Sequence, residues 1–84
     1  MKRKIKVYDA TIDDYKEIEV EVIARYKYIG RELASIEKNK IYDCINYINN
    51  NSIKNGLEII DEDNEPYIYN ANDFELVEQY EDTK

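Results

Sequence analysis

The sequence predicts an all-β fold in which antiparallel strands form a single domain over residues 1–80. Two observations support this prediction. Apolar and charged residues alternate with a period of two along much of the chain, which places them on opposite faces of a strand. The chain has only two glycines and one proline, so asparagine clusters and changes of period mark most of the turns. Residues 81–84 are expected to form a frayed tail.

The clearest strand covers residues 17–28, where one parity is apolar and the other is mostly charged. Residues 2–8 repeat this pattern, with Ile5 and Val7 on the inner face and Lys4 and Lys6 on the outer face, and add a strand at the N-terminus. We therefore expect an antiparallel hairpin centred on Asp13 and Asp14. A shift of two residues would still set lysines opposite glutamates. The expected centre gives the pairs Ile5 with Val22, Val7 with Val20, and Lys6 with Glu21.

An irregular loop is expected after this hairpin, and Asn39 is expected to adopt a left-handed backbone where the loop ends. The next strand covers residues 40–48 and contains Cys44, whose apolar neighbours indicate a buried, unreactive thiol. Asn55 and Gly56 form a strong turn signal before the strand at residues 57–61.

The C-terminal third is expected to begin with a tight connection in which Asn64 again takes the left-handed backbone. A strand follows at residues 66–70. Asn70 or Asn72 should then cap a single helical turn by accepting from backbone N–H groups. After this turn the chain is expected to return to the core through Phe74, Leu76 and Val77.

Four short segments between residues 20 and 78 follow one another in a characteristic order: Lys40-Ile41-Tyr42, Ile60-Asp61-Glu62, Tyr67-Ile68-Tyr69 and Phe74-Glu75-Leu76-Val77. With these segments, residues 20–78 resemble small SH3-like β-barrel proteins of Gram-positive bacteria and their phages. The resemblance implies a small five- to six-stranded antiparallel barrel with one short helical turn, to which this chain adds the N-terminal strand. Asn39 and Asn64 stand where such proteins often have glycine, and Asn70 stands where proline often follows the tyrosines.

The residue types argue against an enzyme. The chain has no histidine, which removes the commonest general acid and base and all histidine metal sites. It also has no glycine-rich loop that could hold a phosphate. The segment from Asp61 to Glu65 has the alternating acids of a calcium loop, but Pro66 stands where that loop needs glycine, and Asn72 stands where it needs glutamate. We therefore expect no catalytic residue, metal or cofactor.

Charge is distributed unevenly along the chain, whose formal net charge is −7. Residues 57–83 contain ten acidic residues and no basic one, whereas residues 1–8 contain four basic residues and no acid. Acidity disfavours direct binding to nucleic acid, and tyrosines beside carboxylates suit a basic partner protein. A role in solubility alone is the competing interpretation. The predicted partner-binding residues are Asp61, Glu62, Asp63, Glu65, Tyr67, Tyr69, Asp73, Glu75, Glu78 and Tyr80, and the pattern leaves open whether Tyr67 and Tyr69 lie in the core.

Three functions remain open on these grounds. The first is a cytoplasmic, non-enzymatic inhibitor of a basic host protein; the phage resemblance suggests a defence nuclease, as with anti-CRISPR or DNA-mimic proteins. The second is a scaffold whose edge strands pair with a peptide or with another copy of the chain. The third is a sponge for a nucleotide signal, formed between subunits. That third function would depend on the basic residues Lys2, Arg3, Lys4, Lys6, Arg25, Lys27 and Arg31. No membrane-spanning segment is expected.

Overall fold

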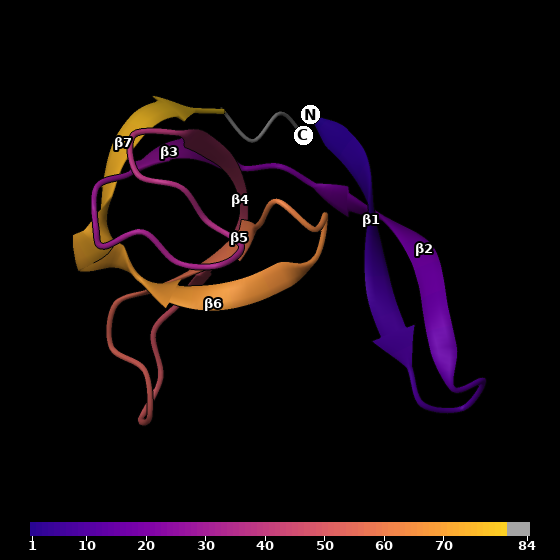
Figure 1. Cartoon of the computed structure of the whole chain (residues 1–84). Helices are drawn as coiled ribbons and strands as arrows, with labels where there is room; N and C mark the ends of the chain where they lie inside the picture. The colour runs from indigo at the N-terminus through magenta and orange to yellow at the C-terminus, as the bar shows by residue number, and fades with distance from the viewer. Residues whose placement is uncertain (81–84) are drawn as a thin grey trace.

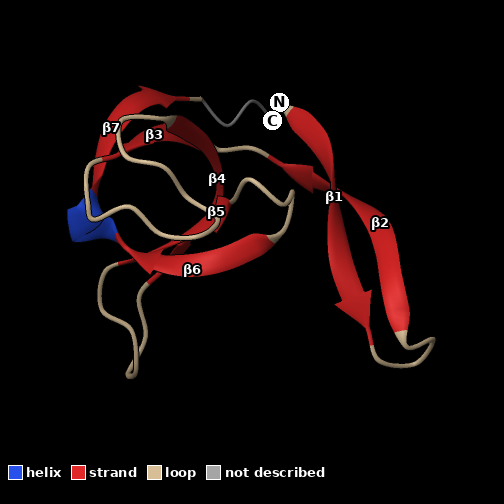
Figure 2. Ribbon diagram, in the orientation of Figure 1, coloured by secondary structure: helices blue, strands red, loops and turns tan. Residues whose placement is uncertain are grey.

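The computed structural model of the protein describes residues 1–80, and the predicted tail at 81–84 lies outside them. The described chain is all-β, as predicted, and its single helical turn is also confirmed (Figures 1 and 2). The elements are β1 (Lys2–Asp9), β2 (Asp14–Glu21), β3 (Ala24–Tyr28), β4 (Ile41–Ile48), β5 (Gly56–Ile60), β6 (Pro66–Asn70), the 3₁₀ helix η1 (Ala71–Asp73) and β7 (Phe74–Gln79).

The strands form two antiparallel sheets rather than one closed barrel, so the barrel prediction is not met. One sheet is the β1–β2 hairpin, and the other has the order β6-β5-β4-β3-β7. In Figure 1 the larger sheet curls around on itself, and the hairpin projects from its side. Because β6 and β7 pair with different inner strands and not with each other, each has one edge that no described strand covers.

The hairpin is confirmed, but its predicted register is wrong by four residues. Ile5 lies opposite Ile18 and Lys6 lies opposite Glu17. The turn starts early because the Asp9 carboxylate accepts hydrogen bonds from the backbone N–H and the hydroxyl of Thr11, at 2.9 and 2.6 Å. The lysines nevertheless face glutamates, as expected for an even shift, in the pairs Lys2 with Glu21, Lys4 with Glu19, and Lys6 with Glu17.

The predicted continuous strand at residues 17–28 is broken between β2 and β3. Val22 still donates its N–H to the carbonyl of Met1, at 2.6 Å, whereas Ile23 donates to the carbonyl of Cys44, at 2.9 Å. The chain therefore changes its partner from β1 to β4 within two residues. Side chains continue to alternate between buried and more exposed across this break, since Val22 and Ala24 are both buried. The sequence pattern therefore could not reveal the break.

The core lies inside the curled sheet and is organised around Phe74. The rings of Tyr28 and Tyr69 lie 5.1 and 5.9 Å from the Phe74 ring, centroid to centroid. The prediction of a buried Cys44 is confirmed. Burial on this scale is the main stabilising contribution in a chain of this length. The buried cluster consists of Ala24, Tyr28, Ile36, Tyr42, Cys44, Leu57, Ile59 and Phe74.

Leu76 and Val77 were predicted to enter the core, and this prediction is wrong. Their side chains are 53% and 50% exposed. Val77 is the extra residue of a β-bulge, since Leu76 pairs with Tyr26 and Glu78 pairs with Arg25. An edge strand that carries a bulge leaves side chains without neighbours on one side, which accounts for the exposure of both residues.

The predicted backbones of two asparagines are confirmed, and the prediction of a turn at Asn55-Gly56 is wrong. Asn39 and Asn64 have left-handed backbones, with φ of 71° and 62°. Gly56 has no positive φ and begins β5 instead. The turn lies earlier, where Asn50 accepts hydrogen bonds from the backbone N–H groups of Ser52 and Ile53, at 2.9 and 2.8 Å.

Gly56 is required for close packing, and its replacement by alanine should destabilise the protein. A Cβ atom at this position would lie 2.8 Å from Cγ2 of Ile53 and 3.0 Å from Cβ of Ile48. We expect Gly56→Ala to lower the free energy of unfolding by about 1–3 kcal/mol, the usual range for overpacking. Urea denaturation followed by circular dichroism measures this effect. Asn55→Ala is the control, because its exposed side chain should contribute less than about 0.5 kcal/mol, and equal stability of the two variants would contradict the packing role.

Candidate binding surface at the β5–β6 turn

The turn between β5 and β6, residues 61–65, is organised by a buried carboxylate. Asp61 is only 5% exposed. Its Oδ1 atom accepts hydrogen bonds from the backbone N–H groups of Asp63 and Glu65, at 2.9 and 3.2 Å. Its backbone N–H donates to the carbonyl of Glu65, at 3.0 Å. Asp61 therefore shapes the turn from inside and is not available to contact a partner.

Asn64 fixes the same turn to the hairpin. Its carbonyl accepts from the N–H of Lys6 at 3.0 Å, and its side-chain amide donates to the carbonyl of Lys4 at 3.3 Å. Arg3 donates to the Asn64 side chain and also to Asp43 on β4, where Nη1 and Oδ2 are 2.7 Å apart. The β5–β6 turn, β1 and β4 are thus held together by a few polar contacts.

The next two predicted residues have partners within the molecule. Glu62 accepts from the Tyr42 hydroxyl at 2.6 Å and from the ammonium of Lys40 at 3.0 Å. These contacts, the tyrosine hydrogen bond first, lower the pKa of the Glu62 carboxyl. Asp63 accepts from the Ser35 hydroxyl at 2.7 Å and is otherwise exposed. Among residues 1–80, Asp63 therefore has no basic partner, whereas the charge of Glu62 is offset by Lys40.

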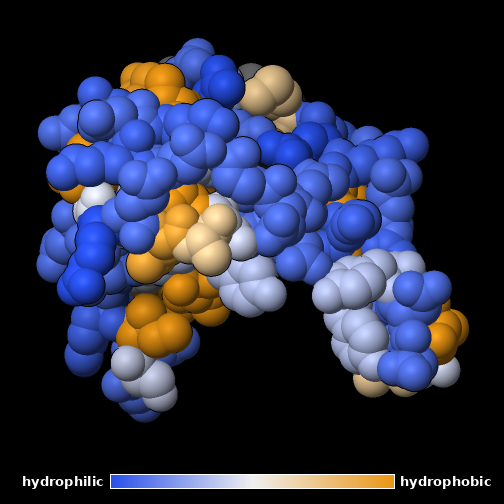
Figure 3. Space-filling view, in the orientation of Figure 1, coloured by the Kyte–Doolittle hydropathy of each residue, from blue (hydrophilic) through white to orange (hydrophobic). Residues whose placement is uncertain are grey.

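Glu65 and Tyr67 lie beside the hairpin. The charge of Glu65 is the main cause that raises the pKa of the Tyr15 hydroxyl, with a further contribution from Tyr67. Tyr15 stands edge-on to Tyr8, with ring centroids 5.7 Å apart. Tyr8, Tyr15 and Tyr67 are each more than half exposed. The structure thus brings two hairpin tyrosines to the acidic turn, and Figure 3 shows an open hollow between the hairpin and the rest of the molecule.

Sequence reasoning missed Tyr8 and Tyr15 as candidate surface residues. They are a cross-strand pair in the observed register, and the predicted register separated them. The available signal was the pair of tyrosines flanking the turn at equal distances from its centre. A hairpin centred on residues 11 and 12 would have placed them opposite each other.

The remaining predicted residues do not join this surface. Tyr69 packs against the core. On β7, Glu75 lies opposite Lys27 and Glu78 lies opposite Arg25 of β3. Asp73 precedes this strand in η1, and Tyr80 follows it with its N–H on the carbonyl of Ile23, at 3.0 Å. Because β6 and β7 are the two ends of the strand order, the predicted residues form two groups, one at the turn and one along β7.

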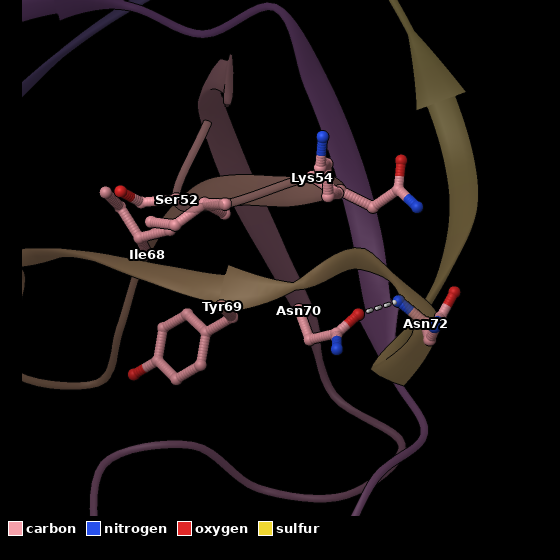
Figure 4. Close-up of a pocket in the computed structure, with 8 residues that line it drawn as sticks. Ser52, Lys54, Ile68, Tyr69, Asn70 and Asn72 are labelled. Carbon is pink, nitrogen blue, oxygen red and sulfur yellow. Dashed lines mark hydrogen bonds between the residues drawn. The ribbon is translucent and has the colours of Figure 1, made fainter. Parts of the chain in front are cut away.

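A separate pocket of about 460 Å³ lies between the loop before β5 and the end of β6 (Figure 4). In its wall, Asn70 Oδ1 accepts from the backbone N–H of Asn72 at 2.9 Å, which confirms the predicted cap of η1. Lys54 is the one charged side chain of the lining, and the acidic turn contributes nothing to it. The lining residues are Ser52, Ile53, Lys54, Asn55, Ile68, Tyr69, Asn70 and Asn72.

The described residues offer little reactive or metal-binding chemistry. Burial raises the pKa of the Cys44 thiol to about 11, so the thiolate is scarce at neutral pH. No group of three or more side chains among the described residues is placed to hold a metal ion. The described part of the chain also contains no helix of the length and apolarity that crossing a membrane requires.

Two substitutions of Asp61 should distinguish the stability gained from its hydrogen bonds from the stability lost by burying its carboxylate. Asp61→Ala removes the acceptor of two backbone N–H groups, and we expect it to lower the free energy of unfolding by about 1–3 kcal/mol. Asp61→Asn keeps an acceptor and removes a carboxylate whose Oδ2 has no hydrogen-bond partner. The asparagine variant should therefore be at least as stable as the native protein at neutral pH.

The pH dependence of the same variants gives an independent check. Burial raises the pKa of Asp61 from 3.8, so the folded state holds this proton more tightly than the unfolded state. The contribution of Asp61 to stability must then fall as the pH rises from about 3.8 through the raised value. We expect the stability of Asp61→Asn relative to the native protein to increase over that interval. Unfolding midpoints between pH 3 and 8 measure the difference, and a difference that decreases with pH would contradict the assignment.

The chain was also compared with known proteins. It matches no protein-family model, no curated protein and no solved structure.

Proposed function

We propose that the protein is a non-enzymatic binding protein whose acidic, tyrosine-bearing surface at the β5–β6 turn contacts a basic partner protein. One observation supports this most directly. Asp61 and Asn64 fix the turn from inside, so that Asp63 is held exposed at the surface and the half-buried Glu65 is held close to the exposed Tyr15 of the hairpin. A rigid surface of this kind loses little conformational entropy on binding, and its carboxylates accelerate encounter with a positive partner.

The identity of the partner class rests on the resemblance to SH3-like proteins of Gram-positive bacteria and their phages. A five-stranded sheet in which a 3₁₀ turn precedes the last strand supports that resemblance. A phage or mobile-element origin makes a host defence protein a suitable target, acting in the cytoplasm. Its nucleic-acid-binding groove would present the lysines and arginines that an acidic surface fits. The function proposed is therefore inhibition by occupation of that groove, of the anti-CRISPR or DNA-mimic type.

A pull-down from host lysate tests this proposal. The tagged protein should retain a basic protein at about 50 mM salt and release most of it at about 500 mM, because screening weakens charge-dependent association. The double variant Asp63→Asn, Glu65→Gln should weaken the retained complex by about tenfold or more. Mass spectrometry identifies the retained protein, and calorimetry with the purified partner measures the affinity.

The chain offers a matched control for this experiment. Glu75→Gln with Glu78→Gln removes the same charge from β7, at the other end of the strand order. This control should bind within about twofold of the native protein if the turn is the contact surface. If both double variants lose the same affinity, binding depends on net charge and not on the turn. Retention of the partner that salt does not weaken would contradict the proposal.

A second candidate function, strand addition at β7, is favoured by a different observation. In residues 1–80 no backbone hydrogen bond reaches the outer edge of β7, and Leu76 and Val77 are exposed there. An antiparallel pair of two β7 strands centred between these residues would set Glu75 against Glu78 of the other copy, which like-charge repulsion disfavours. A foreign peptide strand with basic residues fits this edge better than a second copy does.

Strand addition is tested by a proline that leaves the fold intact. Val77→Pro removes a backbone N–H at the bulge, where Val77 has no partner on β3, so peptide binding at β7 should be lost while stability changes little. Size-exclusion chromatography with light scattering reports self-association in the same samples. A strict monomer whose captured peptides are the same with and without the proline would contradict this function.

The third function, a nucleotide sponge, is the least supported by the contacts. Arg3 and Arg25 both contact the carboxylate of Asp43, at 2.7 and 3.3 Å. In the hairpin, the lysines of β1 lie opposite glutamates. Titration with cyclic and linear nucleotides tests whether these basic side chains can still exchange a carboxylate for a phosphate.

A further inference from the structure

Tyr15 of the hairpin lies close to Glu65 and Tyr67, and Figure 3 shows a hollow between the hairpin and the rest of the molecule. We use the name hairpin cleft for this space and for the residues at its walls: Tyr8 and Tyr15 on the hairpin, and Glu65 and Tyr67 at the start of β6. The hydrogen bond from Lys6 N–H to the carbonyl of Asn64, at 3.0 Å, fixes the two walls at their base. Beyond this contact the hairpin extends away from the larger sheet (Figures 1 and 3).

The walls carry exposed aromatic surface that no described residue covers. Tyr8, Tyr15 and Tyr67 are 55%, 51% and 54% exposed. Tyrosines that gather on a surface are typical of protein interfaces, because each ring supplies a large contact area with few rotatable bonds. Tyr8 packs edge-on against Tyr15 and Tyr67 lies near Tyr15, so three exposed rings at the junction of the hairpin and β6 indicate a docking position.

The chemistry of this position is already demonstrated by a side chain of the protein itself. The ammonium of Lys6 lies 5.7 Å from the centroid of the Tyr15 ring, within the range of a cation–π contact. A positive group is thus attracted to this ring even in a surface setting. The Glu65 carboxylate lies close to this ring, and the Asp13 carboxylate of the hairpin turn accepts a hydrogen bond from the hydroxyl of the neighbouring Tyr8.

We propose that the hairpin cleft binds an arginine side chain of the partner protein, with the guanidinium stacked on Tyr15 and Tyr67 and ion-paired with Glu65. This inference rests on the proposed function and names the group that the acidic surface recognises. Arginine fits better than lysine, because a planar guanidinium can stack on a ring and donate two parallel hydrogen bonds to one carboxylate.

Peptide titration tests the inference without knowledge of the partner. An acetylated, amidated peptide of sequence Gly-Arg-Gly-Arg-Gly is added to isotopically labelled protein, and chemical shifts are followed by NMR. We expect shifts centred on Tyr8, Tyr15, Glu65 and Tyr67. The same peptide with citrulline, which keeps the shape of arginine without its charge, should produce none of them, and the lysine peptide should bind more weakly.

Variants separate stacking from general electrostatic attraction. Tyr15→Leu and Tyr67→Leu keep the net charge, and each should weaken arginine-peptide binding by about fivefold, the factor expected for loss of a cation–π contact. Tyr15→Phe retains the ring and should bind within about twofold of the native protein. Tyr47→Leu is the matched control, since Tyr47 is 44% exposed on β4 and belongs to neither wall.

Removing the Lys6 ammonium from the Tyr15 ring should strengthen binding of the arginine peptide. Lys6→Gln frees the face of Tyr15 and should strengthen binding of the arginine peptide by about threefold. Lys2→Gln removes the same charge at the other end of the hairpin, opposite Glu21, and should change binding less. Equal gains in the two variants would indicate a general charge effect and would overturn the role of Lys6 as an internal competitor of arginine.

The outcomes distinguish failure of this inference from failure of the proposed function. If the leucine variants bind the arginine peptide and the lysate partner like the native protein, while Asp63→Asn with Glu65→Gln loses the partner, the stacking position is wrong and the acidic surface stands. If no variant affects either ligand, both proposals are wrong. Shifts in the cleft that the leucine variants abolish support the inference.

Discussion

The left-handed backbone of Asn64 is the constraint on which the arrangement of the two sheets depends. At φ of 62° the chain can turn from β5 into β6 and at the same time direct the Asn64 carbonyl and side-chain amide to β1. A residue with a branched side chain would be strained in this backbone region. Glycine would permit the geometry but could not supply the amide that bonds to Lys4 and the oxygen that bonds to Arg3. Asparagine satisfies both requirements, so the position explains how a two-stranded hairpin, which is only marginally stable by itself, is attached to the larger sheet.

Folding brings some of the acidic residues into contact with basic ones and so neutralises part of the uneven charge of the chain. Basic residues contact acids that lie further along the sequence: Arg3 and Arg25 contact Asp43, and Lys40 contacts Glu62. These partly exposed pairs contribute little stability individually, but they determine which carboxylates remain free. Asp63 and Glu65 remain free of basic partners among the described residues, and both lie at the turn held by Asp61. Asp73, Glu75 and Glu78 also form no ion pair among the described residues, so the free carboxylates fall into one group at the turn and one along η1 and β7.

Local chemistry made much of the fold predictable, and long-range contacts account for the rest. Asn39 and Asn64 could be assigned left-handed backbones because the preference belongs to the residue itself. The register of the hairpin could not be assigned from its charges, since every even shift sets lysines opposite glutamates; the Asp9 to Thr11 hydrogen bonds decide it. The break after Val22 and the exposure of Val77 depend on which strand lies alongside, and side-chain alternation carries no information about that. For the same reason the predicted acids of the turn lie close together, because they are neighbours in sequence, whereas the two hairpin tyrosines beside them were missed.

The attachment of the hairpin at one end also has a consequence for recognition. Arg3, Ile5 and Lys6 hold the base of β1 through polar contacts and burial, whereas the turn at residues 10–13 lies beyond these contacts and is fully exposed. A ligand between Tyr15 and Tyr67 would therefore contact one wall that the Asp61 and Asn64 hydrogen bonds hold in place and another that is attached to the larger sheet at its base. The turn and the start of β6 supply Glu65 and Tyr67, and the hairpin supplies Tyr8 and Tyr15. The charge and the aromatic area of the proposed site thus come from two sheets, and the contacts of Asn64 determine how these sheets are placed relative to each other.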